Sequence, residues 1–395
     1  MIRRPIILLA VASLFLASCS NEPETVESTT TSTSTTTTTT IATTTTTIAP
    51  FELKGAGDGL TKLIEGFYDY ASGRTDKKPK APKPVLASIK PKTVETPRRG
   101  SATGGNFKER RVVVVEAGED LFLAVNGADG WEIVGGAWPS LGVRPFYGTG
   151  PRIVAVVGSD ARPGQSVTTS RADSIHFVAL DGKRGGAVVG VPRDSYVGIP
   201  SYGTSKITTS LSVGGPDTMM ATFDELTGLP FEGYVITGFA GFESLLTDVL
   251  GGVAVEVPFA INDRWAHANL NAGQQILDGA QALGFARARK TMPDGDLTRS
   301  EHQGVILIGA LRAVRAMGVS AIPALLEASE PYLYTDLTPG KMLTFAAMAV
   351  AAKVDEIDNV VAPGSPGWAG SASVVFLHSS ASDLWADLAD GTLED

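Results

Sequence analysis

The chain has 395 residues, a formal net charge of −9 and a pI near 5.1. This acidic balance argues against a nucleic-acid partner, because proteins that bind nucleic acids usually carry a basic surface. It does not exclude a local basic pocket. The apolar fraction of 43% is sufficient for a large core, and the single Cys excludes a disulfide within the monomer. The 4 His are too scattered to indicate a zinc site.

The N-terminus predicts secretion and a lipid anchor. Arg3 and Arg4 precede an apolar run over 5–16, which is shorter than the ~20 residues that a transmembrane helix needs. The run ends in Leu-Ala-Ser-Cys, which resembles a bacterial lipobox. We therefore expect residues 1–19 to be a lipoprotein signal that ends at Cys19, the lipidation site. The protein would be held at the extracytoplasmic face of the bacterial membrane through its N-terminal lipid.

The next two segments read as connections rather than domains. Residues 20–50 are mostly Thr and Ser, a composition that cannot bury enough apolar surface to fold and that predicts a tether. Residues 51–107 are less defined, because 60–70 has helical spacing whereas 77–84 and 97–99 indicate a stiff basic linker. We expect the folded catalytic domain over 108–395.

The hydrophobic pattern of that region alternates between strands and helices. Strands are predicted at 111–116, 121–125, 131–134, 153–157, 173–180, 187–191 and 234–238. Helices are predicted at 211–227, 242–250, 280–289 and 301–318. The run at 153–157 is continuous and β-branched, as in strands buried on both faces of a sheet. The alternation predicts an α/β domain with helices on both faces of a central sheet.

Charged residues and one glutamine gather at the ends of these predicted elements, where open α/β sheets place ligands. They are Asp160, Arg162, Arg171, Asp173, Arg193, Asp194, Lys206, Arg287, Arg289, Asp294, Asp296, Arg299 and Gln303. Arginine forks suit phosphate oxygens, and a pyrophosphate would balance several of them. Asp160 and Asp173 suit Mg²⁺, a hard cation that carboxylates and substrate phosphates commonly share. Taken singly, these residues are more often surface pairs, solvated helix faces, turns or helix caps. The combination carries the functional interpretation.

The order of these motifs resembles the LytR-CpsA-Psr family of cell-wall ligases over about 152–311. The resemblance lies in Gly-Ser-Asp-Ala-Arg at 158–162, Arg-Ala-Asp-Ser at 171–174, Val-Pro-Arg-Asp-Ser-Tyr-Val at 191–197, Lys-Ile at 206–207, Gly-Gly-Pro at 214–216, Asp-Val-Leu-Gly-Gly-Val at 248–253, and Arg-Ala-Arg at 287–289 through Pro-Asp-Gly-Asp at 293–296 to Arg299 and Gln303. It implies a three-layer α/β/α sandwich with a central mixed sheet. The fold would hold a polyprenyl-pyrophosphate lipid.

The resemblance also implies roles for individual residues. The pyrophosphate would be bound by Arg162, Arg171, Arg193, Lys206, Arg287, Arg289 and Gln303. Asp160 and Asp173 would be catalytic residues at a Mg²⁺ ion. The prenyl tail would lie in an apolar tunnel to which Phe239, Phe242, Leu245, Leu246 and Leu250 could contribute, although ordinary core packing is the favoured explanation for each of them taken alone.

The activity that the resemblance implies is a phosphotransfer. A peptidoglycan hydroxyl would attack the glycan-bearing phosphorus, and polyprenyl phosphate would leave. Asp296 and Arg299 complete the catalytic candidates: Asp296 either takes the hydroxyl proton or only orients Arg299. A pyrophosphatase and a non-catalytic protein that binds the lipid carrier are the alternatives. Thr208, where the family usually has Asn, leaves the glycan and the acceptor sugar open.

Overall fold

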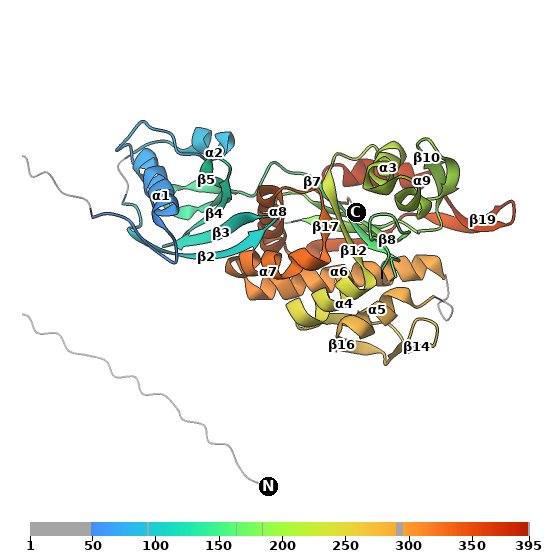
Figure 1. Cartoon of the computed structure of the whole chain (residues 1–395). Helices are drawn as coiled ribbons and strands as arrows, with labels where there is room; N and C mark the ends of the chain where they lie inside the picture. The colour runs from blue at the N-terminus through green and yellow to red at the C-terminus, as the bar shows by residue number, and fades with distance from the viewer. Residues whose placement is uncertain (1–48, 93–94, 163, 184, 290–294, 394–395) are drawn as a thin grey trace, which may run out of the picture. The chain divides into compact units, whose positions relative to one another are not determined.

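The computed structural model describes residues 49–92, 95–162, 164–183, 185–289 and 295–393 (Figure 1). The predicted signal with Cys19, residues 20–48 of the predicted tether and Asp294 lie outside these described residues. Within them the chain forms two six-stranded sheets and four two-stranded ones. The second six-stranded sheet positions the charged residues predicted above.

This central sheet has the strand order β17-β12-β7-β8-β9-β18. Its strands are β7 (Arg152–Ser159), β8 (Ala172–Leu180), β9 (Gly186–Gly190), β12 (Phe231–Gly238), β17 (Tyr334–Thr335) and β18 (Ile357–Val361). β12 is parallel to β7 and β18 to β9, whereas β8 is antiparallel to both of its neighbours. The sheet is therefore mixed, as the resemblance implied, and the strands predicted at 153–157, 173–180, 187–191 and 234–238 are confirmed.

Side chains alternate along each strand, so the central sheet has apolar side chains on both faces. Helices cover both faces. Ile153, Ala155 and Val157 pack against α3 (Thr209–Thr227) and α9 (Ser380–Leu388). Val154 and its neighbours on the other face pack against helices that include α6 (Asp296–Met317) and α8 (Pro339–Ala351). Figure 1 shows the same layers. The predicted three-layer α/β/α fold is confirmed.

Helix boundaries differ from the prediction where glycine and aspartate occur. α3 is broken at Gly214 and Gly215, the latter at φ 68°, so the predicted helix at 211–227 is two segments. α5 (Gly279–Arg287) ends before Arg289. α6 begins at Asp296, five residues earlier than predicted, and an acidic residue in a first turn favours the helix dipole. Among the described residues no single helix is long and apolar enough to cross a bilayer; α6 passes only when joined to Val319–Tyr332, at a bend of 98°.

The remaining elements are short hairpins, short helices and helical turns. They are the hairpins β10 (Tyr196–Ile199) with β11 (Gly203–Lys206), β13 (Val253–Val257) with β16 (Gly273–Leu277), β14 (Ile261–Asp263) with β15 (Ala268–Leu270), and β19 (Gly364–Ala369) with β20 (Ala372–Leu377). Helical segments are α4 (Phe239–Ser244), which continues as a π-turn over Leu245–Val249, α7 (Ile322–Ser329), and 3₁₀ turns at Pro139–Leu141, Val319–Ala321, Glu330–Tyr332 and Val354–Glu356.

The other six-stranded sheet lies in the N-terminal part of the described chain. It consists of β1 (Glu52–Lys54), β2 (Arg99–Phe107), β3 (Arg110–Ala117), β4 (Asp120–Gly127), β5 (Gly130–Trp138) and β6 (Val143–Phe146), in that order. β2 pairs with β3 across residue 108, where the sequence predicted the folded domain to begin. The sequence analysis did not predict β2, because this strand is rich in glycine. At Gly105 a Cβ atom would lie 2.1 Å from the Pro323 carbonyl oxygen, so the close approach of α7 requires glycine there.

Each face of this N-terminal sheet has its own cover. On one face, α1 (Asp58–Ala71) and α2 (Lys83–Ser88) pack on buried residues such as Phe122 and Trp138. The other face carries Val112, Val114, Leu123 and Val125, which pack against α7 and α8. The two sheets thus share helices. The described residues form one compact unit.

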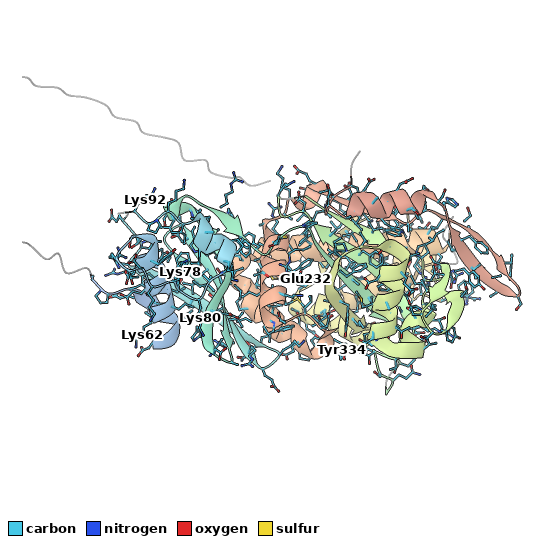
Figure 2. The ribbon with its side chains drawn as sticks, turned by 90° about the horizontal axis from the view of Figure 1, so that it is seen from above. Lys62, Lys78, Lys80, Lys92, Glu232 and Tyr334 are labelled. Carbon is cyan, nitrogen blue, oxygen red and sulfur yellow. The ribbon has the colours of Figure 1, made fainter. Side chains whose placement is uncertain are left out.

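The lysine-rich segment that follows α1 is ordered, whereas the sequence predicted a linker. Lys80 O accepts a hydrogen bond of 2.9 Å from Ile133 N, and Lys92 N donates to Ala71 O at 3.3 Å. Val85 lies between these two attachments and is buried in the core. Lys78, Lys80 and Lys92 belong to this segment, and Lys62 belongs to α1 (Figure 2). The basic segment is therefore a cover of the sheet.

Candidate active site

The direction of the strands brings the predicted charged residues to one edge of the central sheet. β7, β9 and β12 end at this edge, and β8, which runs the opposite way, begins there. Asp160 follows β7, Asp173 opens β8 and Arg193 follows β9. Backbone bonds fasten the edge: Asp160 N donates to Arg171 O at 2.9 Å and Thr208 N to Arg193 O at 3.1 Å. The clustering predicted from the sequence is present.

A cavity of about 350 Å³ opens at this edge. Eight of the predicted site residues line it: Asp160, Arg162, Asp173, Arg193, Arg287, Arg289, Arg299 and Gln303. With Asp263, the lining holds five arginines against three aspartates in a chain of net charge −9. Charge of this sign in a concave site favours an anionic ligand.

Three predicted residues lie outside the lining of that cavity. Arg171 has an exposed side chain, and its backbone N donates to Asp160 Oδ1 at 2.9 Å. Asp296 is buried at the start of α6 rather than on a flexible turn, and it contacts the Arg299 guanidinium. This contact fits a role for Asp296 in orienting Arg299. Lys206 joins the site through Asp194, to which its Nζ donates at 2.9 Å.

Arg193 and Asp173 form the central ion pair. Arg193 Nη1 lies 2.5 Å from Asp173 Oδ2, and both side chains are largely buried. Burial acts against the charge of Arg193, but Asp173, Asp296 and Asp194 outweigh it and raise the pKa of the guanidinium. Asp173 Oδ1 and Arg193 Nε are buried and make no hydrogen bond to any described residue. The pair therefore retains one acceptor and one donor for a ligand.

The other arginines of the cavity are each held in place. Arg162 and Arg287 lie over the Phe239 ring, at 5.3 Å and 4.9 Å from its centroid. Arg289 Nη2 lies 3.7 Å from Asp194 Oδ2, which places Asp194 between Arg289 and Lys206. Burial lowers the pKa of Arg299 to about 10, and the side chain remains cationic at neutral pH. The positive charge is thus organised before a ligand arrives.

A second cavity of about 210 Å³ adjoins the first. Its lining is almost entirely apolar, and it shares Val156, Thr237, Phe242, Ile306 and Leu307 with the charged cavity. Of the residues predicted for a lipid tunnel, Phe242, Leu245, Leu246 and Leu250 line this second cavity, whereas Phe239 lines the charged one. A ligand with an anionic head and an apolar tail matches this pair of cavities.

The side chains present fit the predicted Mg²⁺. Among the described residues no group of three or more His, Cys, Asp or Glu side chains is arranged to hold a metal. A protein cage is not needed, because Mg²⁺ is usually bound by one or two carboxylates together with substrate phosphates. Asp160 and Asp173 line the same cavity, and Asp173 Oδ1 has no partner among the described residues.

The sequence analysis missed two contributors to this cavity. Asp263 and Trp265 come from β14 and the turn that follows it, and both line the cavity. Asp263 Oδ2 accepts a hydrogen bond of 3.1 Å from Arg289 N, which positions the end of α5. Asp263 and Arg289 are 26 residues apart, and no local pattern marks either the aspartate or the tryptophan as part of the site.

A buried histidine that contacts Ser174, a residue of the cavity lining, was missed as well. His176 Nε2 lies 3.0 Å from Ser300 O, and since a carbonyl only accepts, Nε2 carries the hydrogen. Nδ1 then accepts from the Ser174 hydroxyl, 3.3 Å away. Burial lowers the pKa of His176 to about 4, although the bond to Ser300 acts in the opposite direction. The imidazole is therefore neutral in the folded protein at pH 7.

This histidine predicts acid sensitivity. An unfolded chain has a histidine pKa of about 6.5. Because the folded pKa is lower, the stabilisation is complete above that pH and is lost as the pH falls toward 4. We expect the free energy of unfolding, measured in urea, to fall by about 2 kcal/mol between pH 7.5 and pH 5 through His176 alone. His176→Gln should lose this part of the pH dependence, and an unchanged pH profile would contradict the assignment.

Comparison with known proteins identifies the domain that carries these cavities. A model of the LytR_cpsA_psr family matches residues 142–390, well over half of the chain. The chain belongs to the LytR_cpsA_psr family. The resemblance found in the sequence is thereby confirmed, and the family match begins just before β6, the last strand of the N-terminal sheet.

Individual members of the LytR_cpsA_psr family are similar over shorter stretches. The probable cell wall biosynthesis protein LcpB of Corynebacterium glutamicum is 32% identical over 180 residues, which are 42% of this chain and 43% of LcpB. TagT of Bacillus subtilis, named a polyisoprenyl-teichoic acid–peptidoglycan teichoic acid transferase, is 32% identical over 43% of this chain and 54% of its own. The chain spans about half the length of the curated relatives it matches.

Solved structures of the LytR_cpsA_psr family share the fold. TagV of B. subtilis superposes with a TM-score of 0.53 at 24% identity, over 62% of this chain and 99% of TagV. TagT bound to LI-WTA gives a TM-score of 0.52 at 22% identity, over 62% and 92%. At these identities the likeness shows the fold alone.

Proposed function

We propose that this protein is a phosphotransferase that moves a glycan-phosphate from a polyprenyl-pyrophosphate carrier onto peptidoglycan and releases polyprenyl phosphate. The observation that carries the proposal is the junction of a cavity lined by five arginines with an apolar cavity. The pyrophosphate would occupy the first and the start of the prenyl tail the second. The names of TagT and its relatives as teichoic acid transferases support the same reaction class.

The arginines would bind the pyrophosphate before and during the reaction. Arg193 and Arg289 lie at the centre, and Arg162 and Arg287 present guanidinium groups held over Phe239. Donors fixed in this way stabilise charge that develops on the phosphate oxygens and on the leaving group. Mg²⁺, held by Asp160 and Asp173, would neutralise further phosphate charge when bound.

The transfer needs a hydroxyl oxygen placed in line with the phosphorus. As the new oxygen–phosphorus bond forms, the bond to the bridging oxygen breaks and its electron pair leaves with polyprenyl phosphate. Phosphoryl transfer has a loose transition state, so position and charge matter more than a strong base. The hydroxyl proton passes to an aspartate of the cavity. In this proposal Asp296 orients Arg299, because its carboxylate is engaged by that guanidinium.

We also propose a location. A lipid on Cys19 would hold the protein at the extracytoplasmic face of the membrane, where a lipid-linked donor and peptidoglycan meet. Replacing Cys19 by Ser should release the protein from the membrane fraction. Unchanged retention in that fraction would contradict the lipid anchor and leave the reaction proposal standing.

The reaction is tested with purified protein, Mg²⁺, a polyprenyl-pyrophosphate oligosaccharide and peptidoglycan chains. We expect a product in which the oligosaccharide is joined to peptidoglycan by a phosphodiester, together with polyprenyl phosphate, as detected by mass spectrometry. Hydrolysis without transfer would support the pyrophosphatase instead. Lipid binding with neither product would support the non-catalytic carrier protein.

A further inference from the structure

An exposed aromatic side chain lies on a hairpin that is fastened to the active-site edge. β20 is joined to the segment after β9, because Val375 N donates to Asp194 O at 2.8 Å and Val375 pairs with Ser195. Figure 1 shows the β19–β20 hairpin extending beside β10. Phe376, the next residue of β20, is 43% exposed. An aromatic ring left open to solvent on a hairpin bonded to Asp194 is a candidate contact for a ligand.

The surroundings of Phe376 form a small platform. In the register of the hairpin Phe376 lies opposite Ser365, with Gly367 on the same face. The ring lies close over Gly367, where a Cβ atom would come within 2.7 Å of a ring carbon. Tyr196 meets Phe376 edge-on, with the ring centroids 6.0 Å apart. Beside them, Ser365 and His378 are hydrogen bonded at 2.7 Å.

This platform is linked to the charged cavity through Lys206 and Asp194. Tyr196 is the partner of Lys206 in the β10–β11 ladder, so the two side chains share a face. Lys206 bonds to Asp194, and Asp194 lies 3.7 Å from Arg289, which lines the cavity. A chain of contacts therefore leads from the phosphate-binding arginines to the aromatic rings.

We propose that Tyr196 and Phe376, with the Ser365–His378 pair, form a saccharide-binding site for the glycan chain of the acceptor. The C–H face of a sugar ring packs on an aromatic ring, and its hydroxyl groups bond to flanking polar side chains. This assignment rests on the proposed transfer reaction. We assign the site to the acceptor because the two cavities would already hold the pyrophosphate and the prenyl tail of the donor. An acceptor sugar chain has neither, so its affinity depends on stacking.

Binding is measured without any donor, so the result does not depend on transfer. Soluble oligosaccharides of the peptidoglycan glycan chain are titrated into the full-length protein, and calorimetry measures their affinity. Phe376→Ala is expected to weaken binding by about tenfold, the effect of losing one stacking contact. Trp368→Ala is the matched control: Trp368 is 71% exposed on the same hairpin but on its opposite face, and we expect no change.

Kinetics separate the acceptor from the donor. In the transfer assay Phe376→Ala should raise KM for peptidoglycan about tenfold and leave KM for the lipid-linked donor unchanged. A raised donor KM alone, or equal effects of Phe376→Ala and Trp368→Ala on glycan binding, would overturn the assignment. If the wild-type protein binds glycan through Phe376 but transfers nothing, the proposed reaction fails and the saccharide site stands.

Discussion

Replacing Arg193 by Ala is expected to lower the transfer rate by about 10²–10³-fold, the usual effect of removing one fixed donor to developing charge. Arg193 is central because its guanidinium lies 2.5 Å from Asp173 and its Nε has no partner among the described residues. Without it, Asp173 would remain largely buried with its principal counter-charge removed. Single-turnover rates with saturating donor would measure the loss.

Two further variants make the Arg193 result specific. Arg193→Lys keeps the charge but not the planar fork, so it should recover only part of the rate. Arg312→Ala removes an exposed arginine that pairs with Asp355, and it should leave the rate within twofold of wild type. If Arg193→Ala retained wild-type rates while folded, Arg193 would have no part in the reaction.

Replacing Arg152 by Ala is expected to lower the free energy of unfolding by roughly 3–5 kcal/mol, the cost of breaking a buried ion pair. The Arg152 side chain is 3% exposed and pairs with Glu232 at 2.7 Å. It also donates to the Tyr147 carbonyl at 2.7 Å, to the Thr344 hydroxyl at 3.0 Å and to the Lys341 carbonyl at 2.9 Å. One guanidinium thus fastens the start of β7 to β12 and α8. Urea unfolding at neutral pH would measure the effect.

The matched control for Arg152 is Arg99, which also pairs with a glutamate but in a solvent-exposed ion pair. Arg99 and Glu52 are 3.3 Å apart, with side chains that are 85% and 71% exposed. Arg99→Ala should change the free energy of unfolding by less than about 1 kcal/mol. Equal losses in Arg152→Ala and Arg99→Ala would show that burial and the additional hydrogen bonds of Arg152 contribute nothing.

The central sheet could be predicted from sequence because its strands are buried on both faces. The run Ile-Val-Ala-Val-Val at 153–157 has few alternatives to a central strand, and it is β7. β2 could not be recognised, since its residues Gly104 and Gly105 lower strand propensity while tertiary contact with α7 decides the outcome. The start of α6 was missed for a related reason: Asp296 looks like a turn residue until its pairing with Arg299 is seen.

The active site was predictable where charge follows a strand end, and not where it depends on packing. Asp160 directly follows β7, Asp173 is the second residue of β8 and Arg193 lies shortly after β9, so the topology of the sheet alone collects them. Asp263 reaches the cavity through β14, and its partner Arg289 is distant in sequence. Arg171 immediately precedes β8, yet its side chain is exposed, and it takes part at this edge through its backbone, whose N donates to Asp160 Oδ1.

The helices shared by the two sheets bear on how this architecture could be inherited. A module that moves between proteins by recombination carries its own closed core. The N-terminal sheet does not: Val112, Val114, Leu123 and Val125 are covered by α7 and α8, which lie within the family domain. Cutting the chain near residue 142 would leave an exposed hydrophobic surface on both fragments, and each would tend to aggregate. The sheet and the domain that follows it are therefore expected to pass together from ancestor to descendant.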